Sequence, residues 1–314
     1  MKKKLLLFVL MIFIVSKIAF IPNGISLKED DFFIYKITNG GYYLEIGKNK
    51  KIVDGFKFGP YTYPSETKVN STIGSIESHG VTVINWIGNF SSYVFLSIGW
   101  FDSFAIYYSY YTLYHTYEMI ENFGNGYVID LTLFNIKPFT NPKYNGYLAS
   151  PETLGGDISN FFDEWSYWYP DIECSYNHSE KNSVVFFESW VGGEVHSLFG
   201  EMINGGTNYR TDIAFGNNFH FTINKETGIV YGFGRQGWVE GTINNNTVKI
   251  CMTCEYELEG YDLPDYAFGE YHNFLANNNL ALFIAIPSSV VLLSASILLG
   301  FYLRKKKISK KPDN

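Results

Sequence analysis

Residues 219–258 read FHFTINKETGIVYGFGRQGWVEGTINNNTVKICMTCEYEL, and this stretch decides the fold. Runs of aromatic and β-branched residues, which favour strands, alternate in it with groups of Gly and Asn, which favour turns. The pattern predicts an antiparallel meander with strands at 219–223, 229–233, 238–243 and 247–258 and turns at 224–228, 234–237 and 244–246.

The last of these strands alternates along its whole length. Side chains on one face are Val248, Ile250, Met252, Cys254, Tyr256 and Leu258, and those on the other are Lys249, Cys251, Thr253, Glu255 and Glu257. Because successive residues of a strand point to opposite faces, we expect one buried face and one face in water.

The rest of the chain favours the same fold class. Its 314 residues include 25 Tyr, 27 Phe and 29 Gly, a composition that argues against a helical bundle. Further strands are expected at 32–37 and 42–46 around a hairpin at Asn39-Gly40-Gly41, and at 81–87, 93–98, 106–117, 127–136 and 184–191. The prediction is a mainly β domain with a large antiparallel sheet, as a half-barrel or a sandwich.

One segment predicts a helix inserted into this sheet protein. Asp157 can cap it, Pro170 ends it, and apolar residues follow at helical spacing: Ile158, Phe161, Phe162, Trp165 and Trp168. The stripe either fills the core or contacts a ligand through Phe161, Phe162, Trp165 and Trp168, since such rings stack on sugars or line lipid pockets. The acidic residues around it, such as Asp163 and Glu164, could hold Ca²⁺. The preceding residues 138–156, rich in Pro, Gly and Asn, mark either a long loop or a domain boundary.

Both ends of the chain indicate a membrane protein. Residues 1–23 join three lysines to an apolar run, as in a signal peptide or an uncleaved signal anchor. Residues 280–303 are 24 residues without a charge, long enough to cross a bilayer, and the basic tail 304–314 places that end in the cytoplasm. We therefore predict a type I single-pass protein of the cell membrane, with the lipid bilayer as a partner and residues 24–275 outside.

The net charge of −7 is the sum of a positive contribution from the two ends of the chain and a negative one from the residues between them. The two ends hold ten of the 24 basic residues, which leaves fourteen basic against thirty acidic side chains outside, near −16. An acidic ectodomain disfavours nucleic acid as a partner, because phosphate requires clustered Lys and Arg.

The three cysteines leave two alternatives. Cys174 forms a disulfide with Cys251 or Cys254, or all three thiols are unpaired. A metal site at Cys251 and Cys254 is disfavoured, since their spacing along a strand points the thiols to opposite faces. Sequons for glycosylation occur at Asn70, Asn89, Asn177 and Asn245.

Within 280–303, small residues share one arc of the helix and would allow close helix–helix approach, hence a homodimer: Ala281, Ala285, Ser289, Ser296 and Gly300.

Evidence for an enzyme is weak in the sequence. No nucleophile elbow, phosphate loop or paired metal-binding histidines occur, and Glu255, Glu257 and Glu259 are the one set of carboxylates that could serve a glycosidase.

The overall layout resembles uncharacterised archaeal-type single-pass surface proteins. The segment FTINKETGIV at residues 221–230, followed by meandering strands, is similar to a section of the half-open β-barrel of lipoprotein-carrier proteins. That resemblance implies helices packed into the concave face of the sheet, and it carries no site residue over.

Three functions follow from these observations. The first is an extracellular domain that binds an unknown ligand or protein without catalysis. The second is a carrier or sensor of a hydrophobic, lipid-like ligand held between sheet and helix. The third is a surface glycan hydrolase, which needs two carboxylates about 5–10 Å apart in a cleft.

Overall fold

A computed structural model of the chain confirms an antiparallel meander over residues 219–258, with three strands in place of the four predicted. Its strands are β10 (Arg210–Asn224), β11 (Val230–Ile243) and β12 (Asn246–Leu258), each antiparallel to the next. The model describes residues 27–97, 99–122, 136–140, 146–166, 171–198, 210–265 and 267. The predicted signal, membrane helix, basic tail and most of the predicted strand at 127–136 lie outside the described residues.

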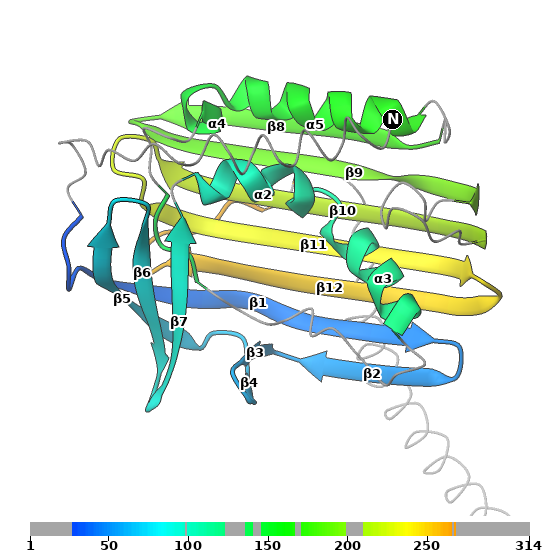
Figure 1. The fold of residues 1–314 in the computed structure, drawn as a ribbon, viewed down its shortest axis with the longest axis horizontal. Helices are drawn as coiled ribbons and strands as arrows, with labels where there is room; N and C mark the ends of the chain where they lie inside the picture. Colours follow the sequence, from blue (N-terminus) through cyan, green and yellow to red (C-terminus); the bar gives the residue numbers. More distant parts are fainter. Residues whose placement is uncertain are drawn as a thin grey trace, which may run out of the picture. The chain divides into compact units, whose positions relative to one another are not determined.

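A ten-stranded sheet forms the body of the molecule (Figure 1). Its order is β7-β6-β5-β1-β12-β11-β10-β9-β8, and β2 pairs with β1 beside this path. The remaining strands are β1 (Phe32–Ile46), β2 (Asn49–Asp54), β5 (Lys68–Glu77), β6 (Gly80–Ile87), β7 (Phe90–Ser97), β8 (Glu173–Lys181) and β9 (Val184–Leu198). Two short strands, β3 (Phe56–Phe58) and β4 (Tyr61–Tyr63), form a separate pair. The prediction of a mainly β chain with a large antiparallel sheet is confirmed, and strands from both sides of residues 138–156 share this sheet.

Two predicted turns are wrong, because glycines pair within strands at both places. The expected hairpin at Asn39-Gly40-Gly41 lies inside β1, where these residues oppose β12 after a bulge that follows Ile37. The expected turn at 234–237 lies inside β11, opposite Phe219, Asn217 and their neighbours in β10. In β1, a side chain on Gly40 would lie 3.1 Å from Cβ of Phe56, so glycine permits the close approach of β3.

The predicted strand at 106–117 is wrong as well. Helices α2 (Trp100–Tyr108) and α3 (Tyr111–Asn122) occupy this stretch. Phe101, Ala105 and Tyr108 are buried at spacings of four and three, which is the period of a helix face. Tyrosines on the remaining positions made an alternating pattern fit equally well, so the period of 3.6 was not evident from the sequence.

The inserted helix is present but begins earlier than predicted. It is α5 (Pro151–Ser166), with proline in its first turn, and a four-residue helix α4 (Gly146–Ala149) precedes it. Position 155 of α5 has to be small, because a Cβ on Gly155 would come 2.3 Å from the ring of Tyr176 in β8. The helix can therefore pack closely on the edge of the sheet.

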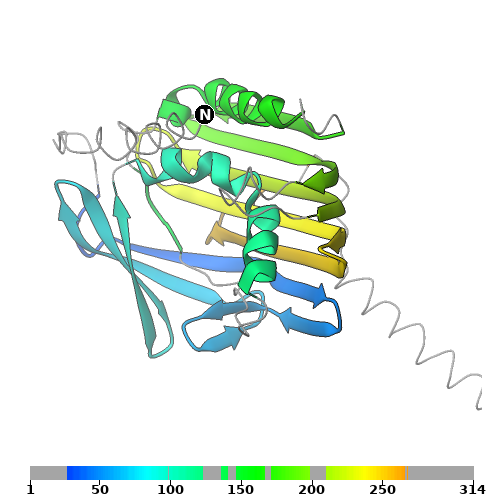
Figure 2. The ribbon, with the colours of Figure 1, turned by 45° about the vertical axis from the view of Figure 1, so that its right-hand side comes forward.

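Helices α2, α3 and α5 lie on one face of the sheet (Figure 2), called the helix-bearing face below. Phenylalanines of the central strands fill the layer between: Phe219 and Phe221 of β10 contact Phe101 of α2 and Phe187 of β9. All four side chains are buried. The core of the protein lies in this layer.

The opposite face of the sheet is also largely covered, so the prediction of a wet face on β12 is wrong. Cys251, Thr253 and Glu257 are buried there. After β12 the chain crosses this face: Leu263 lies over Gly232 of β11, and the backbone N–H of Ala267 donates to Oε1 of Glu188 in β9 at 2.7 Å.

Removing a ring from the core layer should destabilise the fold strongly. We expect Phe221→Ala to lower the free energy of unfolding by about 3–5 kcal/mol, because transfer and cavity effects add. Tyr93→Ala is the matched control, since Tyr93 is 68% exposed on β7. Urea unfolding of the two variants checks this, and equal losses of stability would contradict the placement of the core.

Candidate functional site

The predicted ligand-contacting stripe of α5 belongs to the core where it is described. Phe162 is buried, and Phe161 stacks on Tyr110 with ring centroids 5.5 Å apart. Tyr110 also meets the ring of Phe162 edge-on at 6.1 Å. The side chain of Trp165 and the whole of Trp168 lie outside the described residues. The first two rings therefore support the interpretation that the stripe fills the core.

The structure contains no disulfide between Cys174 and either of the other two cysteines. Cys174, Cys251 and Cys254 are all free. Cys174 is on β8, whereas the other two are on β12, four strands away in the sheet. With strands about 4.8 Å apart, this separation far exceeds the ~7 Å between Cα atoms that a disulfide tolerates.

The other predicted sites fall partly within the described residues. Asn89, Asn177 and Asn245 are exposed, and Asn70 is half-buried on β5. Across the described part of the chain, no cluster of three or more His, Cys, Asp or Glu could hold a metal ion. No helix in that part is long and apolar enough to cross a membrane. The small-residue stripe from Ala281 to Gly300 lies outside it.

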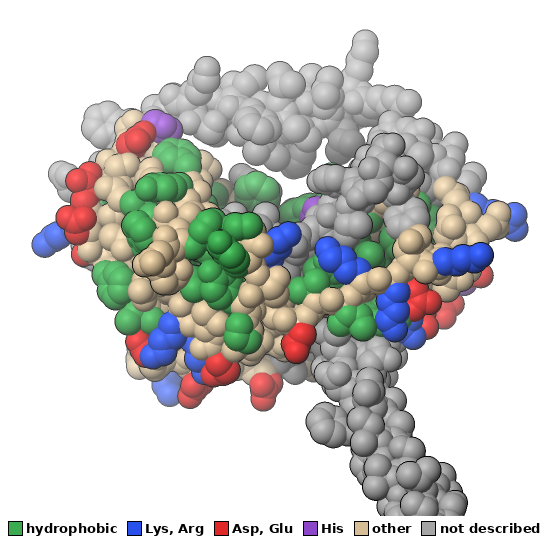
Figure 3. All heavy atoms as spheres, turned by 90° about the horizontal axis from the view of Figure 1, so that it is seen from below, with side chains coloured by type: hydrophobic (Ala, Val, Ile, Leu, Met, Phe, Trp, Pro, Cys, Tyr) green, Lys and Arg blue, Asp and Glu red, His purple; other side chains and the backbone are tan. Residues whose placement is uncertain are grey.

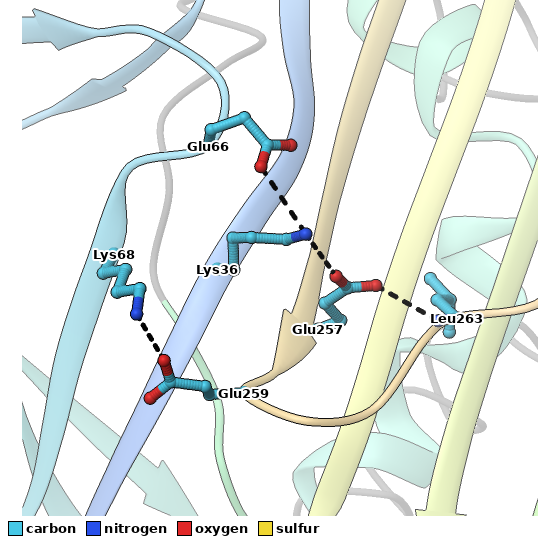
Figure 4. Close-up of polar contacts among 6 residues, drawn as sticks. All are labelled: Lys36, Glu66, Lys68, Glu257, Glu259 and Leu263. Carbon is cyan, nitrogen blue, oxygen red and sulfur yellow. Dashed lines mark hydrogen bonds and ion pairs between the residues drawn. The ribbon is translucent and has the colours of Figure 1, made fainter.

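The carboxylates at the end of β12 form ion pairs (Figure 4). Glu257 accepts from Nζ of Lys36 at 2.9 Å and from the backbone N–H of Leu263 at 3.1 Å. Glu259 pairs with Lys68 of β5. Glu255 accepts from Nε2 of Gln236 at 2.7 Å. These contacts tie β12 to β1, β5 and the chain that leaves the sheet, which supports a structural role for these carboxylates.

The helix-bearing face holds a different group of polar side chains, which the sequence did not single out. Arg235 points from the middle of β11 towards α3, where its guanidinium carbon lies 3.8 Å from the centroid of the Tyr111 ring. The same carbon is 5.6 Å from the centroid of Tyr108, and Nη2 lies 3.7 Å from Sγ of Cys254. Two residues further along β11, Gly237 allows α3 to lie close to the strand. A Cβ on Gly237 would lie 2.0 Å from Oγ1 of Thr112 in α3.

Arg235 is 8% exposed and keeps its charge at every physiological pH. None of the carboxylates in the described residues forms an ion pair with it, and its Nε has no hydrogen-bond partner there. Aromatic faces offset part of the cost of burying this charge, about 2 kcal/mol for a desolvated cation–π contact. The charge is therefore incompletely compensated.

A second cation lies next to the first. Nζ of Lys137 donates to the hydroxyl of Tyr108 at 2.7 Å, and it lies 4.4 Å from the ring centroid of Trp100 and 5.1 Å from that of Phe104. Burial, together with repulsion from Arg235, lowers the pKa of Lys137 to about 7. Arg235, Lys137, Tyr108 and Tyr111 are called the cationic cluster below.

The backbone around Lys137 explains why this lysine is held inside. Residues 136–140 are clamped between strands and helix: the carbonyl of Ile136 accepts from Nδ2 of Asn85 at 3.1 Å, and that of Phe139 accepts from Nε1 of Trp100 at 2.9 Å. The N–H of Val230 donates to the carbonyl of Pro138 at 2.9 Å. The chain is thus fixed on both sides of the lysine.

A hydrogen-bonded chain lies beside the cationic cluster. The hydroxyl of Tyr107 is 2.7 Å from Nε2 of His115, whose Nδ1 is 2.8 Å from Oε2 of Glu118. Burial first, and then the charge of Arg235, lower the pKa of His115 to about 4, so the imidazole is neutral at pH 7. The order of groups is that of a catalytic triad, but burial raises the pKa of Tyr107 and keeps its hydroxyl protonated. The chain therefore fixes α2 to α3 rather than activating a nucleophile.

Sequence reasoning missed both cations for identifiable reasons. Arg235 stood in a Gly-rich group interpreted as a turn, although Phe233, Arg235, Gly237 and Val239 continue the alternation of a strand. Lys137 directly precedes the stretch 138–156 that was assigned to a loop or boundary.

The lowered pKa of Lys137 makes stability depend on pH. Between pH about 7 and about 9 the folded protein holds Lys137 neutral while the unfolded chain still protonates it, so stability should rise with pH by ~1–2 kcal/mol. Lys137→Met should lack this increment, and other titrating groups cancel in the comparison. Urea unfolding at several pH values measures it. Parallel pH profiles for the two proteins would show that Lys137 is not buried beside a second cation.

Comparison with known proteins assigns no role to these residues. No protein-family model matches the chain, and none of the curated proteins matches it.

Proposed function

We propose that the chain is a type I single-pass membrane protein whose extracellular β domain binds a ligand on its helix-bearing face without catalysis. The observation that carries this proposal is the cationic cluster, in which two cations face aromatic rings with no acidic partner among the described residues. Such an arrangement costs stability, because no ion pair among the described residues offsets the desolvation of the two charges. Selection for binding accounts for its presence.

The anchoring half of the proposal rests on the ends of the chain. The uncharged run 280–303 and the six basic residues that follow it support a single crossing with the tail in the cytoplasm. Residues 24–275 would then face the outside, together with all four sequons.

The two alternatives have less support. A carrier of a hydrophobic ligand was expected to hold it against α5, where Phe161 and Phe162 instead pack on Tyr110. A half-barrel that curls around the helices, as in lipoprotein carriers, would favour this alternative and stays a prediction. A glycan hydrolase would need free paired carboxylates, whereas Glu257 and Glu259 are occupied by lysines.

Translation of the full chain into microsomes tests the topology. We expect glycans at the exposed Asn89, Asn177 and Asn245, seen as a mass shift that endoglycosidase removes and that replacement of all three by Gln abolishes. Protease added outside should remove an epitope at the C-terminus and leave residues 24–275 protected. A protected C-terminal epitope would contradict the proposed orientation.

Ligand retention tests the binding half. The full chain, extracted from its native membrane in a nonionic detergent, should carry a bound small molecule that native mass spectrometry detects. Tyr111→Ala should lose it, because Tyr111 forms one wall of the cationic cluster. The control is Tyr93→Ala, which changes an exposed tyrosine on β7 away from the helices. Equal retention by both variants would place the ligand elsewhere and contradict the proposal.

A further inference from the structure

We propose that the cationic cluster binds an oxyanion, a carboxylate or a phosphate, and that, where this group belongs to a lipid, the apolar part of the lipid lies against α2. This inference rests on the proposed function and names the chemistry of its ligand. The shared chemistry has two sources, an acidic lipid or a free oxyanion such as inorganic phosphate.

The argument begins with the two charges. Arg235 projects from β11, and Lys137 from the clamped segment 136–140, and both meet the ring of Tyr108, at 5.6 Å and 5.5 Å from its centroid. When Lys137 is protonated, it and Arg235 repel each other through a medium of low dielectric constant. One anion next to both would replace this repulsion with two attractions.

The donors suit an oxyanion in particular. A guanidinium presents a planar fork of N–H groups that matches two oxygens of a carboxylate or phosphate. Nε of Arg235 has no partner in the described part of the chain, and it is one of the atoms of that fork. The ammonium of Lys137 has one donor engaged by Tyr108 and two more to offer.

The surroundings provide the apolar contact and the approach. Phe104, over which Nζ of Lys137 lies at 5.1 Å, is 43% exposed on α2. Three half-buried tyrosines of α2, α3 and the turn between these helices are close to it in the sequence: Tyr107, Tyr110 and Tyr111. Seen from below, hydrophobic side chains gather on the surface of the described part of the molecule, with Lys and Arg side chains close to them (Figure 3). An amphipathic anion fits such a surface better than a fully hydrated ion does.

A metal cation is the occupant that these charges exclude. Two positive side chains repel a cation, and the neutral rings around them supply no carboxylate ligand. The hydrogen-bonded chain through His115 contributes none either, since Glu118 already contacts Nδ1 of His115.

The first test compares two lipids on the full chain in nonionic micelles. Native mass spectrometry should show one bound phosphatidic acid at about tenfold lower concentration than phosphatidylcholine of the same acyl chains. Lys137→Met, which keeps the aliphatic stem, should lose this preference, a change of ~1.4 kcal/mol. Lys181→Met is the matched control, because Lys181 is exposed on β8. Arg235→Gln is a second variant, and Lys137→Met keeps the test decisive if that variant does not fold.

The second test uses inorganic phosphate against chloride at equal ionic strength. Preferential stabilisation of the wild type over Lys137→Met in thermal unfolding would support a free oxyanion as the source, whereas a preference for phosphatidic acid alone would support the lipid. Equal binding of both lipids without a phosphate effect would overturn the oxyanion inference and leave the proposed binding function standing. Loss of all ligand binding would overturn both.

Discussion

The uninterrupted pairing of β11 between β10 and β12 is the constraint on which the rest of the structure depends. Through residues 234–237 the strand keeps its register with both neighbours, so Phe233, Arg235 and Gly237 face the helices in succession. A turn at this place would have released Arg235 into water. Because the strand continues, the arginine is delivered to α3, and Gly237 provides the space in which Thr112 can approach. One register thus sets both the core layer and the cationic cluster.

The sequence predicted strands well where alternation is regular and long. Residues 247–258 and 184–191 fall within β12 and β9, because their side chains must fit a pleated surface whatever lies next to them. Glycines in β1 and β11 misled the prediction, since the same residue permits a turn or a close approach of another element. Only tertiary contacts, such as that between Gly40 and Phe56, decide between the two. Tyrosine in α2 and α3 similarly fits either period, and packing on β11 selected the helix.

The cationic cluster was harder to predict than the fold for a physical reason. Its residues are far apart in the sequence, at Tyr108, Lys137 and Arg235, and they converge through hydrogen bonds of the backbone at Ile136, Pro138 and Phe139. None of these bonds depends on a side-chain motif around Lys137. Polar groups that gather in this way leave no local pattern, whereas the apolar stripe of α5 has one and belongs to the core. In this protein the regular apolar spacing of α5 indicates core packing, whereas the polar residues of the cationic cluster show no such spacing.

The charge of the proposed ectodomain places a further condition on a ligand. A surface near −16 repels anions at long range, but salt at physiological concentration screens charges beyond about 8 Å. Inside that distance Arg235 and Lys137 dominate, and low dielectric constant strengthens them. A small hydrated anion gains little from reaching them, since it must leave water. An amphipathic anion also buries apolar area, at about 25 cal/mol per Å², against Phe104 and the tyrosines of α2 and α3. In the proposed ectodomain, an acidic exterior combined with a cationic, aromatic interior would therefore favour ligands that carry one negative group on an apolar body.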